Sequence, residues 1–346
     1  MKKREYYFDN AKFILISLVV FGHFLQSFIA DSKTIYTIYK VIYTFHMPAF
    51  ILASGYFAKG FNKNGYVAKI TRKLILPYLI FQVIYSVFYY FLNKESSFQV
   101  DPLQPHWSLW FLISLFSWNL MLRLFTKYKP IFSISAAFTI GILVGYFDWI
   151  TNYLSLSRTF VFFPLFLIGY YIKREHFYYL NSAKIRIIAI NIFAIVFIGF
   201  YMFPDINHEW LLGSKPYTVM GAAAIEAVLT RLGFYFLSLV MVFSFFTLVP
   251  KGQYFFTTLG KNTLYVYLLH GFFVRIFRVS SVQDYFSEPE NYLLLAGISI
   301  LLTLLLSSKI AIPFAQPLIE LKTTKLKNLR IRAIATMRYY RNKLLN

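Results

Sequence analysis

Long apolar segments, separated by short loops that hold most of the charged residues, dominate this 346-residue sequence. Hydrophobic residues make up 58% of the chain and charged residues 14%, whereas a typical soluble domain has about 25% charged residues. A helix needs about 20 apolar residues to cross a bilayer. We therefore predict an all-α, polytopic membrane bundle of about ten transmembrane helices. The predicted spans are 11–30, 38–58, 74–92, 108–125, 131–147, 159–173, 184–203, 231–249, 262–279 and 291–312.

The basic residues are distributed unevenly between the two sets of loops. Lys and Arg number 35 against 14 Asp and Glu, which gives a formal net charge of +21. If the N-terminus is placed inside, most Lys and Arg fall on the inner side, as the positive-inside rule requires. We therefore predict that both termini and the loop 59–73 are cytoplasmic. Nucleic acid is not expected as a partner, because membrane orientation explains the charge.

The sequence has no internal repeat and no linker to a second domain. We predict one transmembrane domain over residues 1–320. A basic amphipathic tail over 321–346 is expected to lie on the anionic lipids of the inner leaflet. The absence of cysteine excludes disulfides, thiolate metal sites and a cysteine nucleophile. Association with a second copy of the chain stays open.

Three histidines lie inside predicted spans. His23, His46 and His270 fall roughly 12–18 Å from the inner ends of their spans, at 1.5 Å per helical residue. Ionisable side chains at this depth are costly and are therefore candidates for a functional site. One interpretation is that each imidazole only bonds a hydroxyl or carbonyl of a neighbouring helix. The other is general-base catalysis, for which neutral imidazole is suited near pH 7.

A metal site built from the three histidines is a rival interpretation. However, no two of them are spaced i, i+4, and the sequence has neither an HExxH motif nor a carboxylate cluster near them. We therefore expect no metal cofactor.

Two charged residues stand at the inner end of the first span. Lys12 precedes His23 by eleven residues, about three helical turns, so both project from nearly the same face, roughly 16 Å apart. Asp9 is three residues before Lys12. We expect Asp9 to pair with Lys12 and orient it.

The loop before the third span is basic, with Lys69, Arg72 and Lys73 at its end. These cations satisfy the positive-inside rule without any ligand. Alternatively, Lys69 and Arg72 share a helix face at i, i+3 and bind a polyphosphate from the cytoplasm, with Lys12 approaching from the first span. Spacing alone does not choose between the two.

Two tryptophans, Trp107 and Trp110, open the fourth span at its outer end. Tryptophans in this position commonly form the interfacial aromatic belt. The alternative is a platform on which a sugar ring stacks.

Five stretches of the chain together resemble the acyltransferase-3 family of multi-spanning O-acyltransferases, most closely its fucose 4-O-acetylase-type branch. The segment 45–57 is the most specific of them. Lysine stands at Lys12 and Lys69 where many members have arginine, and an ammonium lacks the bidentate fork of a guanidinium. The five stretches are DNAKFILISLVVFGHF (9–24), FHMPAFILASGYF (45–57), KITRKLILPY (69–78), HWSLWFLISLF (106–116) and LGKNTLYVYLLHG (259–271).

The resemblance implies a ten-helix core in the bacterial cytoplasmic membrane, and transfer of a small acyl group from acyl-CoA, with acetyl-CoA as the expected donor. The acceptor is a hydroxyl of an extracytoplasmic or lipid-linked sugar. Some members carry an additional extracytoplasmic esterase-like domain, which we do not expect here. Teichoic acid, capsule, peptidoglycan and secreted polysaccharide all stay open as acceptors, as does a longer acyl group.

The resemblance also suggests a role for each candidate residue. His23 and His46 are the expected catalytic residues, with His23 acting either as base or as transient acyl carrier, and Asp9 supports them through Lys12. A transporter or flippase for a glycan is the alternative function, because midplane ionisable groups and a helix broken at Met47-Pro48 also suit that class. The expected donor site is Lys12, Lys69, Arg72, Lys73, Lys261 and Asn262, and the expected acceptor site is Trp107, Trp110 and His270.

Overall fold

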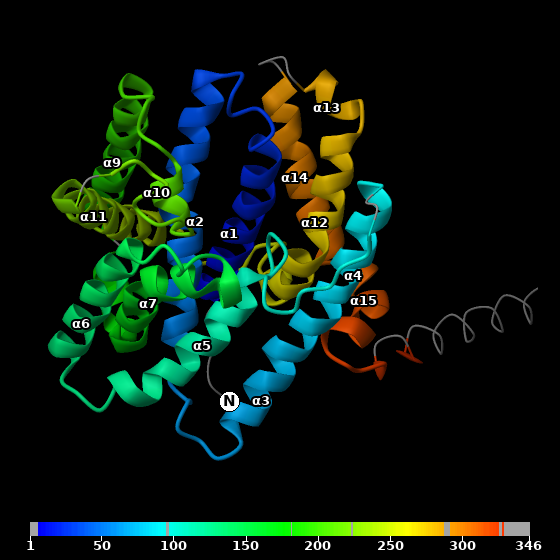
Figure 1. The fold of residues 1–346 in the computed structure, drawn as a ribbon, viewed down its shortest axis with the longest axis horizontal. Coiled ribbons are helices and arrows are strands. Elements are labelled where there is room, and N and C mark those ends of the chain that lie inside the picture. The colour runs from blue at the N-terminus through cyan, green and yellow to red at the C-terminus, as the bar shows by residue number, and fades with distance from the viewer. Residues whose placement is uncertain are drawn as a thin grey trace, which may run out of the picture.

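A computed structural model of the chain describes residues 6–94, 97–180, 182–222, 224–286, 291–324 and 327–328. The described residues form helices joined by turns, so the all-α prediction is confirmed (Figure 1). Of the predicted tail over 321–346, residues 325–326 and 329–346 lie outside the described residues. The helices are α1 Tyr6–Leu25, α2 Lys33–Phe57, α3 Tyr66–Ile70, α4 Leu76–Leu92, α5 Trp110–Phe125, α6 Pro130–Leu143, α7 Leu156–Tyr171, α8 Arg174–Tyr179, α9 Ala183–Met202, α10 Glu209–Leu212, α11 Ala224–Leu248, α12 Thr263–Val279, α13 Val282–Tyr285, α14 Tyr292–Leu306 and α15 Ala311–Ile319.

Each of the ten predicted spans overlaps one of these helices, but fewer helices meet the length and composition of a membrane span. Five helices do so alone, and a sixth span is possible if α14 and α15, bent by 68°, count as one. The helices Trp110–Phe125 and Pro130–Tyr146 are apolar but shorter. The chain is therefore an integral membrane protein, whereas the number of crossings and their orientation stay predictions.

Helix α9 shows how strongly the outer surface of the bundle is apolar. Only 11% of its most apolar 18-residue stretch is buried inside the protein. The side chains of Ile187, Ile195 and Ile198 are 61%, 67% and 54% exposed. A soluble protein rarely exposes so continuous an apolar face. The face matches the hydrocarbon of a bilayer, where helices satisfy their backbone groups internally.

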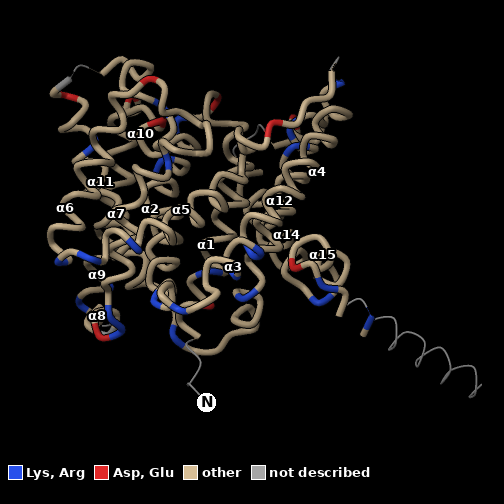
Figure 2. The backbone as a smooth tube through the Cα atoms, turned by 60° about the horizontal axis from the view of Figure 1, so that its bottom comes forward, with Lys and Arg blue, Asp and Glu red and all other residues tan. Residues whose placement is uncertain are grey.

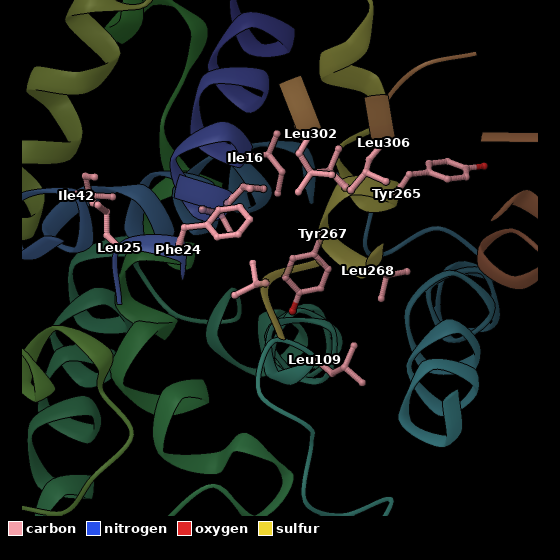
Figure 3. Packing of buried hydrophobic residues seen from close by; sticks show 14 of the residues in the cluster. Ile16, Phe24, Leu25, Ile42, Leu109, Tyr265, Tyr267, Leu268, Leu302 and Leu306 are labelled. Carbon is pink, nitrogen blue, oxygen red and sulfur yellow. The ribbon is translucent and has the colours of Figure 1, made fainter. Parts of the chain in front are cut away.

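Helix α1 lies at the centre of the bundle and positions the site. It packs against α2, α12 and α14 (Figure 1). Buried apolar side chains from these helices form one cluster, which includes Ile16, Ile42 and Leu302 (Figure 3). A residue on α1 therefore meets residues that are more than two hundred positions away in the sequence.

The first turn of α1 is fixed by the loop that precedes α12. Asn10 is fully buried, and its amide donates to the carbonyls of Pro250 and Gly252 at 2.8 and 2.9 Å. The Thr257 hydroxyl donates to the Asn10 side-chain oxygen at 2.6 Å. Gly260 lies so close to the Asp9 carbonyl that a Cβ there would overlap it. These contacts place Asp9 and Lys12 beside the start of α12.

Lys and Arg gather at one end of the bundle, which holds the start of α1 together with α3 and α8 (Figure 2). We call this the basic end. The turn that holds α10 lies at the opposite end (Figure 2). The charge distribution in space therefore agrees with the asymmetry inferred from the loops. The cytoplasmic location of this end stays a prediction.

Candidate active site

His23 lies in the last turn of α1 and meets aromatic side chains from three other segments. Its ring centroid is 4.1 Å from that of Trp107 and 5.4 Å from that of His270, whose ring stacks with it. Its Nδ1 lies 3.2 Å from the hydroxyl of Tyr43 on α2. The fold thus brings two of the three predicted histidines into one cluster with a predicted acceptor tryptophan.

His46 belongs to the same region through Tyr43. The Tyr43 and His46 rings lie 4.4 Å apart, edge to face. The Nδ1 of His46 lies 2.8 Å from the Ile42 carbonyl oxygen, and because a carbonyl only accepts, Nδ1 carries the hydrogen. The Nε2 of neutral His46 is therefore the nitrogen with a lone pair.

His270 is tied in the same way and is completely buried. Its Nδ1 donates to the Val266 carbonyl at 2.9 Å, which leaves Nε2 as the basic nitrogen. Within the described part of the chain, this Nε2 has no hydrogen-bond partner. His46 and His270 therefore each give one nitrogen to a carbonyl of their own helix. The packing interpretation expects a bond to a neighbouring helix instead, and the second nitrogen of each histidine is left for other use.

A cavity of about 140 Å³ opens beside these rings, and we call it the histidine cavity. His23, His46, Trp107 and Trp110 line it, so four of the predicted site residues share one wall. Aromatic and polar side chains dominate the lining, as in sites that bind sugars by stacking and hydrogen bonding. The remaining lining residues are Val19, Gln26, Tyr39, Tyr43, Met47, Ser108, Arg158, Phe162, Leu211, Leu212 and Tyr267.

A second cavity, of about 230 Å³, begins at Lys12, and we call it the basic-end cavity. The Lys12 ammonium lies 2.9 Å from the Asp9 carboxylate, which confirms the predicted pair. The rest of the lining is almost entirely apolar: Ile16, Val19, Met47, Phe50, Ala53, Ser54, Phe57, Leu74, Phe111, Leu112, Leu115, Thr263, Leu264 and Tyr267.

The two cavities adjoin, because Val19, Met47 and Tyr267 line both. The Tyr267 hydroxyl donates to the Ser108 carbonyl at the start of α5, which fixes this wall. Figure 3 shows Tyr267 projecting from α12 toward α5. Met47 is unbranched and flexible. One rigid and one adaptable side chain therefore border the region between Lys12 and His23.

Comparison with known proteins identifies the family of the chain. Residues 5–311 match the family of the acyltransferase domain, Acyl_transf_3. The chain belongs to the acyltransferase-3 family. The protein is therefore a membrane acyltransferase, and the suspected resemblance of the five stretches is confirmed.

Two curated relatives of this acyltransferase carry the same name. Nodulation protein NolL of Sinorhizobium fredii is 30% identical over 141 residues, which cover 36% of this chain and 38% of the relative. Nodulation protein NolL of Mesorhizobium japonicum is 47% identical over 60 residues, 16% of each chain. Both matches span less than two thirds of the relative's own length. No solved structure matches the chain.

The predicted donor residues of this acyltransferase lie near the basic-end cavity but, apart from Lys12, do not line it. Lys69, Arg72, Lys73 and Lys261 are exposed at the basic end. Their neighbours in sequence, Leu74 and Thr263, contribute to the cavity wall. The four cations are therefore exposed and close in sequence to residues of the cavity wall, but they do not line the cavity.

Asn262 has a structural partner instead of a free side chain. Its amide donates to the Ser307 carbonyl at 3.0 Å, which joins the start of α12 to the end of α14. This contact explains the asparagine without any ligand. The donor role predicted for Asn262 stays a prediction.

The sequence analysis missed three arginines around the histidine cavity. Arg158 lines it, with its guanidinium 5.1 Å from the Trp110 ring centroid. Arg275 and Arg278 lie 5.3 and 5.2 Å from the Trp107 ring centroid. Arg158 precedes the predicted sixth span on its outer side, and the other two lie near the outer end of the ninth. Arginines at the outer ends of spans depart from the positive-inside bias. This departure is the signal in the sequence that could have identified all three.

Tyr43 was missed as well, because an aromatic residue in an apolar segment gives no signal of its own. Its role depends on which residues α1 brings opposite it. Metal binding gains no support from the geometry: among the described residues, no three His, Asp or Glu side chains are grouped closely enough to hold an ion.

Proposed function

We propose that this protein is an O-acetyltransferase that moves an acetyl group from acetyl-CoA to a hydroxyl of a cell-envelope or extracellular glycan, or of its lipid-linked precursor. One observation carries the proposal: in a member of the acyltransferase-3 family, a cavity that begins at Lys12 adjoins a cavity that contains His23. The two cavities suit a donor and an acceptor that approach from opposite ends of the bundle.

The donor approaches from the basic end, which in this proposal faces the cytoplasm. Exposed Lys69, Arg72, Lys73 and Lys261 surround the entrance and bind the phosphates of CoA, since ammonium and guanidinium groups form charge-assisted hydrogen bonds with phosphate. Lys12, held by Asp9, contributes a further cation just inside. The uncharged pantetheine arm then lies in the apolar cavity and directs the thioester toward Met47 and Tyr267.

The acceptor sugar occupies the histidine cavity from the opposite end. Trp107 and Trp110 offer aromatic faces against which a pyranose ring can pack. In this proposal the hydroxyl to be acetylated lies beside His23.

His23 acts as the general base in the transfer step. In the tautomer of His23 that donates its Nδ1–H to the Tyr43 oxygen, Nε2 is left to take a proton. As the acceptor oxygen bonds to the thioester carbonyl carbon, its proton passes to His23. The carbon–sulfur bond then breaks, and the proton moves from His23 to the CoA sulfur. His270, stacked on the same imidazole, and Trp107 keep the ring in position.

The test uses purified protein, membranes that contain the acceptor glycan, and acetyl-CoA labelled in the acetyl group. The wild type should release free CoA and transfer the label to glycan. His23→Gln should lower the rate about 10²–10⁴-fold, because an amide cannot take a proton near neutral pH. An interhelical hydrogen bond in a membrane contributes only about 0.6 kcal/mol on average, so this variant should still accumulate.

His176→Gln is the matched control, because His176 is exposed on α8. It should leave transfer unchanged. Retained transfer in His23→Gln at normal protein level would remove His23 from the mechanism and leave His46 as the remaining base in the cavity. A wild type that moves a glycan across vesicles without cleaving acetyl-CoA would instead support a transporter.

A further inference from the structure

Arg158 stands out in the histidine cavity because no acidic residue in the described part of the chain forms an ion pair with it. Its Nε donates to the Leu212 carbonyl at 3.3 Å, and its Nη1 lies 3.5 Å from the Asn152 side-chain oxygen. Both acceptors are neutral and both distances are long for hydrogen bonds. Among the residues that the structure describes, no carboxylate lies within ion-pair distance of this guanidinium.

Glu209 on α10, next to the cavity residue Leu211 in sequence, forms its ion pairs with residues other than Arg158. The Oε1 of Glu209 forms an ion pair with the Lys215 ammonium at 2.9 Å and lies 3.9 Å from the Nε2 of His208. Both contacts involve Oε1, whereas Oε2 is buried and has no hydrogen-bond partner among the described residues. Arg158 therefore has no direct anionic partner among the described residues.

Arg275 and Arg278 add to the positive charge on the Trp107 side of the cavity. Arg278 has a structural role, because it donates to the His23 carbonyl at 2.8 Å and to the Gln26 side-chain oxygen at 2.9 Å, at the end of α1. Neither arginine has an ion-pair partner in the described ranges, and the Nε of each is buried without a hydrogen bond. Each of the two tryptophans thus has at least one guanidinium within 5.3 Å of its ring centroid.

An uncompensated guanidinium in a partly buried cavity is costly unless a ligand supplies the anion. Arg presents a planar fork of donors that matches carboxylate and phosphate oxygens. A neutral sugar stacked on Trp110 would leave that fork unused. A sugar that carries an oxyanion would satisfy the arginine and the tryptophan together.

We infer that the acceptor is an anionic glycan, in which a carboxylate or phosphate group close to the acetylated hydroxyl binds Arg158. This inference rests on the proposed O-acetyltransferase function and specifies its substrate class. Arg158 orients the acceptor, whereas His23 performs the proton transfer. Arg275 and Arg278 raise the local positive potential that attracts such a substrate.

The first part of the test identifies the charge of the product. Membranes that contain the protein are supplied with acetyl-labelled acetyl-CoA, and the labelled glycan is cleaved to small oligosaccharides and passed over an anion exchanger. We expect the label to be retained at neutral pH. Elution at pH 2 indicates a carboxylate, which is then protonated, whereas retention at pH 2 indicates a phosphodiester. Label in the neutral, unretained fraction overturns the inference.

The second part measures the dependence on Arg158. With saturating acetyl-CoA, Arg158→Gln should lower transfer to the anionic acceptor about 10- to 100-fold, as expected for loss of charge-assisted hydrogen bonds. Arg158→Lys should restore part of the loss, because it returns the charge without the fork. Both variants are compared at equal protein level in the membrane. Arg123→Gln, which alters an exposed arginine at the end of α5, should not change transfer.

The outcomes separate this inference from the proposed function. Transfer to glycan that is equal in Arg158→Gln and Arg123→Gln contradicts the role of Arg158, although the enzyme remains an O-acetyltransferase. A wild type that transfers no label to any glycan contradicts the proposed function itself.

Discussion

At the scale of single residues, His23 differs from the other two buried histidines in its bonding. His46 and His270 each give Nδ1–H to a carbonyl of their own helix, whereas the Nδ1 of His23 meets a side chain from another helix. The orientation of the His23 ring therefore depends on Tyr43. The hydroxyl of Tyr43 is the contact that decides whether Nε2 of His23 is free to act as base.

Tyr43→Phe tests this contact. The substitution keeps the aromatic ring but removes the hydroxyl, so His23 should be less well oriented. We expect the rate of acetyl transfer to fall about 2- to 12-fold, which corresponds to one hydrogen bond of 0.5–1.5 kcal/mol, and its pH profile to change because the ring nitrogens lose a fixed partner. Tyr201→Phe alters an exposed tyrosine of α9 and should change neither quantity. A pH profile identical to that of the wild type would make Tyr43 merely a packing residue.

Lys69 and Arg72 are tested together for phosphate binding. Replacing both with Gln removes two exposed cations at the basic end. If they bind CoA phosphates, the apparent affinity for acetyl-CoA should fall more than about 10-fold, since each charge-assisted bond contributes roughly 1.5–3 kcal/mol. Replacing the exposed residues Lys127 and Lys129 with Gln removes the same charge elsewhere. Equal affinity in the two double variants would assign Lys69 and Arg72 to membrane orientation alone.

At the scale of helices, glycine determines how closely α2 and α7 approach. A Cβ on Gly55 would overlap the Phe166 carbonyl, and a Cβ on Gly169 would overlap the Leu52 carbonyl. Small residues allow this close approach of backbones in membrane helices. Because α2 carries Tyr43, His46 and Met47, the same contact holds one wall of the histidine cavity in place.

Gly55→Ala and Gly169→Ala should therefore destabilise the protein. Inserting a methyl group into a tight contact costs about 1–3 kcal/mol, so both variants should melt at a lower temperature in detergent. Gly199→Ala is the control, because nothing lies within 4 Å of a Cβ at that position of α9. Melting temperatures that fall equally in all three variants would show that the α2–α7 contact has no special importance.

The sequence predicted where helices occur better than how they begin and bend. Hydropathy placed the third span at 74–92, whereas the helix starts at Tyr66 and widens into a π-turn over Thr71–Ile75. The Leu76 N–H bonds the Thr71 carbonyl, five residues back, next to Pro77, which has no N–H to donate. Because π-turns depend on such local bonding, hydropathy carries no signal for them. The argument that Lys69 and Arg72 share one helix face assumed α-helical spacing, whereas Arg72 lies in the π-turn.

At the scale of the whole molecule, spacing along the first helix predicted that Lys12 and His23 serve one site, but it could not predict their partners. Lys12 lines one cavity and His23 the next. Asp9 could be paired with Lys12 from sequence because the two are near neighbours. The sequence could not predict the partners of Tyr43, Arg158 and Arg278. Their contacts with α1 and with the tryptophans arise only when distant helices pack.

The orientation of the bundle is tested with single cysteines in this cysteine-free chain. Lys63 lies in the basic-end loop, and Lys215 lies near α10 at the opposite end, with its side chain 45% exposed. In intact cells a membrane-impermeant maleimide should label Lys215→Cys but not Lys63→Cys. Both should react after the membrane is permeabilised. Labelling of Lys63→Cys in intact cells would reverse the proposed orientation.

The central claim is that a donor at the basic end supplies an acyl group to an acceptor at the other end, with His23 between them. The most direct measurement supplies acetyl-labelled acetyl-CoA to the outside of sealed membrane vesicles of both orientations. We predict that inside-out vesicles, which expose the basic end, transfer the label to glycan, that right-side-out vesicles do not, and that His23→Gln abolishes the transfer at normal protein level. Equal transfer in both orientations, or full transfer by His23→Gln, would contradict the account.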